Sequence, residues 1–150
     1  MRGLDLAGQP VKRGSMAHDH DVYMVLADTA AQLRDKNGLQ QYAPRLEELA
    51  KRDGHKLHLA IAHRAQGIAQ CLAGEYKDAV TRFNRALEIF NELGTRWQIG
   101  RTLYDLGEME AARAKKSQAR EYLAQALAQF EALKANPDIE RTRAAMKKIK

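Results

Sequence analysis

The sequence contains a single cysteine, three prolines and few aromatic residues: one tryptophan, five tyrosines and three phenylalanines. One cysteine excludes an internal disulfide framework and fits a reducing compartment. No apolar run approaches the roughly 20 residues of a membrane-spanning helix, and the first twenty residues lack the apolar core of a secretory signal. Because 45% of the residues are hydrophobic, a core can still form. We therefore expect a cytoplasmic protein that folds without disulfide bonds.

Residues that commonly carry catalysis are also scarce. The only serines are Ser15 and Ser117, which leaves no serine triad. Cys71 lies among alanine and leucine residues of an expected helix, where a packed thiol is favoured over a nucleophile. Glycine-rich phosphate loops, zinc signatures and dinucleotide fingerprints do not occur. Three histidines lie close together in the sequence: His55, His58 and His63. No cysteine or carboxylate lies near them at the spacing that a metal site needs. We expect no catalytic site, no metal and no cofactor.

The net charge of +6 is concentrated near the C-terminus. Residues 21–133 carry sixteen positive and fifteen negative side chains, whereas residues 134–150 carry six positive and two negative ones. Binding of nucleic acid through this basic end would be expected to use interleaved aromatic residues, which are absent there. Nucleic acid is therefore the least favoured partner. Acid pairs such as Glu108 and Glu110 are expected on solvated helix faces rather than in a catalytic site.

Strong helix formers dominate from Asp21 onward and predict an all-α domain. Turn signals, the first of them at residues 36–38, divide the chain into seven helical segments. Pro44 falls where a helix should already be running, so we expect that helix to start late or to kink. Residues 1–20 are expected to be an irregular or disordered lead-in, 21–135 a repeat domain, and 136–150 a C-terminal capping helix with a basic end. The expected repeat units are 21–55, 56–94 and 95–135.

An internal repeat appears when the sequence is shifted by 40 residues. The shift superposes six pairs of identical residues: Gly67 and Gly107, Ala79 and Ala119, Ala86 and Ala126, Leu87 and Leu127, Phe90 and Phe130, and Leu93 and Leu133. Small residues at such positions let antiparallel helices approach closely, and the large ones fill the space between hairpins. The first unit is less regular, because Ala27 replaces the glycine. Its large residues fit best after a one-residue slip: Tyr42, Leu46 and Leu49.

These residues resemble the signature of the tetratricopeptide repeat family, which places a glycine, two alanines and a large residue at set spacings. The matching positions are Gly67, Ala79, Phe83 and Ala86 in the second unit, and Gly107, Ala119, Leu123 and Ala126 in the third. The period of 40 exceeds the family's usual length of about 34 residues, and the closing proline is missing. Units of this length resemble those in C-terminal regions of bacterial signalling ATPases, transcription regulators and nucleotide cyclases.

The resemblance implies about three antiparallel helix pairs and a capping helix in a right-handed superhelix. Its concave face would be lined by the first helix of each pair and would bind a peptide or helix of a partner protein. The groove positions that the resemblance implies are Asp21, Met24, Asp28, Gln32, Ile61, Arg64, Ile68, Leu72, Arg101, Tyr104 and Glu108. The asparagines of the carboxylate clamp that some members use are missing. We expect a regulatory or scaffolding role, with self-association through apolar ends as the alternative.

Overall fold

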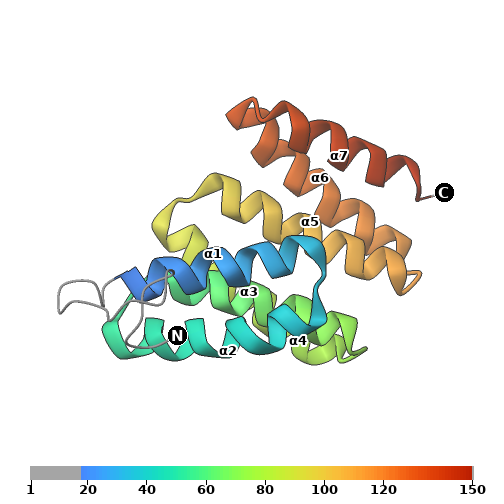
Figure 1. The fold of residues 1–150 in the computed structure, drawn as a ribbon. Helices are drawn as coiled ribbons and strands as arrows, with labels where there is room; N and C mark the ends of the chain where they lie inside the picture. The colour runs from blue at the N-terminus through green and yellow to red at the C-terminus, as the bar shows by residue number, and fades with distance from the viewer. Residues whose placement is uncertain (1–17, 150) are drawn as a thin grey trace.

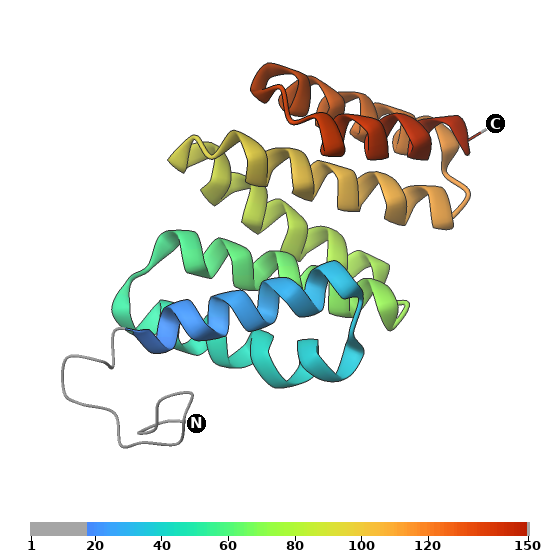
Figure 2. The same ribbon diagram turned by 45° about the horizontal axis from the view of Figure 1, so that its top comes forward.

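The computed structural model describes residues 18–149, which form seven helices and no strand (Figure 1). The helices are α1 (His18–Leu33), α2 (Lys36–Asp53), α3 (Lys56–Leu72), α4 (Tyr76–Leu93), α5 (Arg96–Ala112), α6 (Lys116–Leu133) and α7 (Asn136–Lys147). Three antiparallel pairs stack in chain order, and α7 packs on α6 (Figure 2). The predicted all-α repeat architecture is confirmed. Most of the predicted lead-in lies outside the described residues, and α1 already begins at His18.

The backbone repeats itself every twenty residues. A residue with left-handed conformation, which is needed to reverse the chain after a helix, follows each of the first six helices. These residues are Arg34, Gly54, Gly74, Gly94, Ala114 and Lys134. From α2 on, each helix with its connection therefore occupies twenty residues, and equivalent positions in successive pairs are forty residues apart. Because the first unit keeps this spacing, the predicted one-residue slip within it is wrong.

Burial in the second helix of each pair explains why the first unit looked irregular. Four equivalent positions are buried in all three units: Leu39, Ala43, Leu46 and Ala50 in α2, Ala79, Phe83, Ala86 and Phe90 in α4, and Ala119, Leu123, Ala126 and Phe130 in α6. The later units alternate small and large residues, whereas α2 alternates large and small ones. The buried positions are thus the same in all three units, but in the first unit the large and small residues have exchanged places.

Close contact between the helices of a pair explains the signature glycines. A Cβ atom added to Gly67 would lie 2.8 Å from the ring of Phe83, and one added to Gly107 would lie 2.7 Å from the side chain of Leu123. Only a glycine leaves room for these large side chains. In the first unit the equivalent positions hold Ala27 and Ala43, so a glycine is not needed there.

The start of α2 differs from the prediction. The expected break at residues 36–38 is wrong because the chain turns at Arg34 and Asp35, and α2 begins at Lys36. The Asp35 side chain caps the helix by accepting a hydrogen bond from the Gly38 backbone N–H at 3.1 Å. Pro44 lies inside α2, so the alternative that this helix starts late is also wrong.

The last helix has a charged outer face. A shift of 40 aligns α7 with α5, and Ile139 and Thr142 are buried like their counterparts in α5. The positions at which α5 meets α6, however, carry exposed charged residues in α7: Glu140, Arg143 and Lys147. Such a face is typical of a helix that ends a repeat stack. Among the described residues, no helix is both long and apolar enough to cross a membrane.

Candidate functional site

Side chains from α1, α3 and α5 meet in a buried ion network on one side of the stack, which we call the inner face. Arg64 of α3 is 2% exposed, and its Nε donates to Asp105 Oδ2 of α5 at 2.6 Å. Its Nη1 donates to Asp28 Oδ1 of α1 at 3.0 Å. Arg101 of α5 donates to both oxygens of the same aspartate, at 3.2 and 3.1 Å. Charge-assisted hydrogen bonds thus join the first helices of all three units.

The network brings together units that are not neighbours in the stack. Asp28 and Arg101 are 73 residues apart, and Gln32 Oε1 accepts from Arg101 Nη2 at 2.8 Å. Burial, and then the nearby guanidinium of Arg64, lowers the pKa of Arg101, but an arginine remains charged at any pH at which the protein folds. The inner face is therefore filled by its own side chains over part of its length.

A further contact comes from the connection between α1 and α2. Arg34 takes the left-handed conformation that ends α1, which carries its side chain toward α5. Its Nη2 lies 3.4 Å from Asp105 Oδ1 and 3.4 Å from Glu108 Oε1. These distances are longer than those that Arg64 makes, and the Arg34 side chain is 36% exposed. Its Nη1 also donates to the Ala31 carbonyl oxygen at 3.0 Å, so Arg34 is anchored to the end of α1 while part of its side chain remains accessible from solvent.

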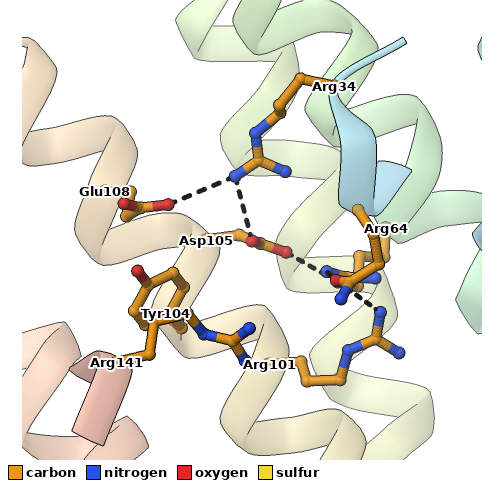
Figure 3. Close-up of a pocket in the computed structure, with 8 residues that line it drawn as sticks. Arg34, Arg64, Arg101, Tyr104, Asp105, Glu108 and Arg141 are labelled. Atoms are coloured by element: carbon orange, nitrogen blue, oxygen red, sulfur yellow. Dashed lines mark hydrogen bonds and ion pairs between the residues drawn. The ribbon is translucent and has the colours of Figure 1, made fainter. Parts of the chain in front are cut away.

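These residues surround a cavity of about 220 Å³ (Figure 3). Its lining holds four guanidinium groups and two carboxylates, and the complete set is Gln32, Arg34, Arg64, Arg101, Tyr104, Asp105, Glu108 and Arg141. Arg64 and Arg101 are buried, whereas Arg34 and Arg141 are partly exposed. The arginine cavity, as we call it, thus offers two accessible cations in front of a neutralised interior.

The capping helix contributes to the arginine cavity. The Arg141 guanidinium lies over the ring of Tyr104, 5.3 Å from its centroid, and it also pairs with Asp138. Burial, and then the neighbouring Glu108, raises the pKa of Tyr104 to about 12, so its hydroxyl stays protonated. A hydrogen bond with Glu108 contributes to this shift, so the single proton of the hydroxyl already has a carboxylate partner in the cavity.

A second cavity of about 250 Å³ borders the first and shares Arg34, Asp105 and Glu108 with it. The rest of its lining is mostly apolar: Ile68, Cys71, Leu72, Phe83, Met109 and Ala112. Burial raises the pKa of the Cys71 thiol, which keeps it protonated and poorly nucleophilic. An apolar recess therefore lies beside the arginine cavity.

The structure brings most of the predicted groove residues to these two cavities. Five line the arginine cavity (Gln32, Arg64, Arg101, Tyr104 and Glu108), and Ile68 and Leu72 line the apolar one. The remaining four, Asp21, Met24, Asp28 and Ile61, line neither. The open part of the predicted groove is smaller than expected, because four of its residues are buried: Ile61, Arg64, Ile68 and Arg101.

Sequence reasoning missed three cavity residues. Arg141 was assigned to the basic end, although its position 40 residues after Arg101 was a usable signal. Asp105 was not assigned to the groove, and its two arginine partners were not foreseen. Arg34 follows α1 at a position held by Gly74 and Ala114 in the other units, so the repeat gave no indication of it.

Trp97 is 45% exposed, its Nε1 donates to Asp138 at the start of α7, and its ring lies under the Arg101 guanidinium. One other expectation was wrong. Glu110 was expected on a solvated face but is buried, because it pairs with Arg113 at 2.9 Å. The partner of Trp97 lies in the capping helix, whereas Arg113, the partner of Glu110, is only three residues away.

His63 is buried on α3, where it meets charged residues of α2 and α4. Its Nδ1 accepts a hydrogen bond from Arg82 Nη1 at 2.9 Å, and Arg82 also pairs with Glu47. Burial lowers the pKa of His63 to about 4, an effect that Glu47 opposes and that Arg82, Arg85 and Lys51 reinforce. For Glu47, burial alone would raise the pKa, but hydrogen bonds from Lys51 and Arg82 lower it. The described residues contain no group of three or more side chains placed to hold a metal.

Stability should therefore fall when the pH is lowered from about 7 to about 5. In the unfolded chain His63 binds a proton near its ordinary pKa of about 6.5, whereas in the folded chain its imidazole stays neutral until the pH nears 4. Because of this difference, the free energy of unfolding should fall by about 2 kcal/mol between pH 7 and pH 5. Urea unfolding should show the loss in the native chain and a smaller loss in His63→Gln, which keeps an acceptor for Arg82. Equal losses would contradict the assignment.

Comparison with known families gives one match. The family described as the tetratricopeptide repeat matches residues 58–132, which run from the first turn of α3 to the last turn of α6. No curated protein matches the chain.

Proposed function

Because this match spans half of the chain, the chain belongs to the tetratricopeptide repeat family, and we propose that it binds an acidic segment of a partner protein at the arginine cavity. Repeats of this family generally mediate protein–protein interaction and are generally non-catalytic. Since a fold alone does not choose a ligand, the site must do so. The observation that carries the proposal is that two of the four guanidinium groups that line the cavity, those of Arg34 and Arg141, remain partly exposed.

The size and chemistry of the cavity suit a single acidic side chain. A volume of about 220 Å³ is below the 300 Å³ or so at which small-molecule sites usually begin. A carboxylate entering it would meet Arg34 and Arg141, which are accessible. The neighbouring apolar recess would take an adjacent apolar residue. The proposed ligand is thus an acidic and apolar pair of residues in a peptide or helix.

The basic end of the chain supports this proposal over nucleic-acid binding. Arg141 lines the arginine cavity, and Arg143 pairs with Glu131 of α6 at 2.9 Å. Arg141 therefore faces the arginine cavity and Arg143 is paired within the fold, so these two cations do not form one open basic surface for a phosphate backbone. We further propose a regulatory or scaffolding role in the cytoplasm. Its support is the 40-residue period, which resembles the repeats of larger bacterial signalling proteins.

Replacing Arg141 with glutamine should weaken binding of an acidic peptide about tenfold, because one charge-assisted hydrogen bond is worth roughly 1.5 kcal/mol. The probe is a fluorescein-labelled peptide of alternating glutamate and leucine, followed by fluorescence anisotropy. Arg143→Gln is the matched control, since Arg143 is also exposed on α7 but does not line the cavity. Equal weakening by both changes, or equal binding of a peptide with glutamine in place of glutamate, would sink the proposal.

A further inference from the structure

A third cavity lies at the C-terminal end of the stack, where α5, α6 and the end of α7 meet. Its volume is about 270 Å³. Four of its lining residues are apolar and three are charged, and the complete set is Ala111, Leu123, Ala145, Ile149, Glu108, Lys116 and Lys148. We call this cavity the terminal recess.

The terminal recess repeats the apolar recess one unit further along the stack. A shift of 40 residues carries six residues that line the apolar recess onto six that line the terminal recess. The pairs are Ile68 and Glu108, Cys71 and Ala111, Phe83 and Leu123, Asp105 and Ala145, Glu108 and Lys148, and Met109 and Ile149. Each recess lies between the two helices of one pair and the helix that follows. The two recesses are therefore equivalent sites, one repeat apart.

The charges of the two recesses differ. Two carboxylates of the apolar recess, Asp105 and Glu108, are replaced by Ala145 and Lys148 in the terminal recess. Lys148 and the second lysine, Lys116, are exposed, and neither forms an ion pair with a residue in the described part of the chain. The terminal recess thus presents two unpaired cations beside an apolar lining. It favours an apolar side chain that has an acidic neighbour.

Glu108 connects the recesses, because it lines the apolar recess, the terminal recess and the arginine cavity alike. Its side chain is 44% exposed. Neighbouring helices pack about 8 to 10 Å apart, so one step of the stack between the two recesses is on the order of 10 Å. One short segment of a partner can therefore reach both recesses.

We propose that the two recesses together bind one amphipathic helix of a partner protein, whose two apolar anchors lie seven residues apart beside acidic residues. This inference rests on the proposed function for the acidic character of the partner. Seven residues of an α-helix span roughly 10.5 Å and return to the same face. In an extended strand, residues three apart span about 10 Å but face opposite sides. The distance between the recesses therefore favours a helix over a strand.

Two fluorescein-labelled peptides of the same composition test the spacing. Both are helix-forming sequences of alanine, glutamine and glutamate with two leucines. The leucines are seven residues apart in one peptide and five apart in the other, which places them on different faces. Fluorescence anisotropy should show about tenfold tighter binding of the seven-residue spacing, because its second leucine is buried as well. Equal binding, or tighter binding of a proline-rich peptide with leucines three apart, would overturn the proposal.

Filling the terminal recess should remove this preference. Ala145→Phe places a ring in the recess and should weaken the seven-residue peptide about tenfold, while the five-residue peptide is unaffected. The matched control is Ala144→Phe, since Ala144 is exposed on the same helix and does not line the recess. Circular dichroism checks that both variants keep their helices.

A second variant changes only exposed side chains. Lys116→Glu combined with Lys148→Glu should also weaken the seven-residue peptide, because the terminal recess then repels its glutamates. Lys77→Glu with Lys134→Glu makes the same change of charge at exposed positions that line neither recess, and it should bind as the native chain does. Equal weakening by both pairs would contradict the proposed site.

The outcomes separate this proposal from the one for the arginine cavity. If Arg141→Gln leaves binding unchanged while Ala145→Phe weakens it, the arginine cavity is not the site and the two recesses stand. If Arg141→Gln weakens binding while leucine spacing and Ala145→Phe have no effect, the helix proposal is overturned alone. No binding of any peptide would overturn both. A doubled mass in light scattering that Ala145→Phe abolishes would mean that a second copy of the chain fills the terminal recess, which would also overturn it.

Discussion

Replacing Arg64 with methionine should lower the free energy of unfolding by about 3 kcal/mol, with no ligand involved. The change leaves the buried carboxylate of Asp105 without its 2.6 Å partner, and only the longer contact with Arg34 remains. Asp28 loses one arginine but keeps Arg101. Urea unfolding followed by circular dichroism measures the loss. A cost below about 1 kcal/mol would mean that the network is solvated, as exposed ion pairs are.

The double variant Arg64→Met with Asp105→Leu separates the pair from its surroundings. Replacing both members of a buried ion pair by apolar groups of similar volume is often nearly neutral, whereas removing one is costly. The double variant should therefore be more stable than Arg64→Met alone. Removing Arg64 alone, as in Arg64→Ala, is a poor test of ligand binding, because the unpaired Asp105 disturbs the fold that positions Arg34 and Tyr104.

Replacing Phe83 with alanine should cost about 3 to 5 kcal/mol, because it leaves a cavity between α3 and α4. Phe83 is 1% exposed, and its ring fills the space left by Gly67. The same unfolding experiment measures this loss.

The effect of Gly67→Ala should change sign with the residue at position 83. In the native chain the new Cβ would lie 2.8 Å from the Phe83 ring, and the overpacking should cost about 1 kcal/mol or more. In Phe83→Ala the ring is absent, and alanine should stabilise the helix by about 0.5 to 1 kcal/mol relative to glycine. Equal effects in both backgrounds would contradict the close approach of α3 and α4.

The sequence carried the fold because its signals are local. Helix formers predict helices. The small and large residues that recur after 40 positions predict that Gly67 and Phe83 lie where two helices pack together. The first unit was misaligned for a physical reason: α2 keeps the same buried positions but exchanges large and small residues. A match based on residue size therefore slips by one residue. A match based on the left-handed positions, which include Arg34 and Lys134, does not.

The candidate site was only partly visible in the sequence because its contacts are long-range. The family resemblance pointed to Arg64 and Arg101 as groove residues. It gave no means of knowing that Asp28 of α1 would pair with both, and that Asp105 of α5 would also pair with Arg64. Arg34 and Arg141, the cations that remain accessible, come from a helix end and from the capping helix. Contacts between helices far apart in the sequence decided which arginines stayed open, and no local pattern encodes them.

Nuclear magnetic resonance of the arginine side chains tests the proposed function most directly. In a titration with the glutamate and leucine peptide, the Nε–Hε signals of Arg34 and Arg141 should shift and saturate together. Those of Arg143 and of Arg52, which pairs with Asp53 on the surface, should stay in place. Shifts confined to Arg143 and the basic end, with Arg34 and Arg141 unmoved, would contradict binding at the arginine cavity.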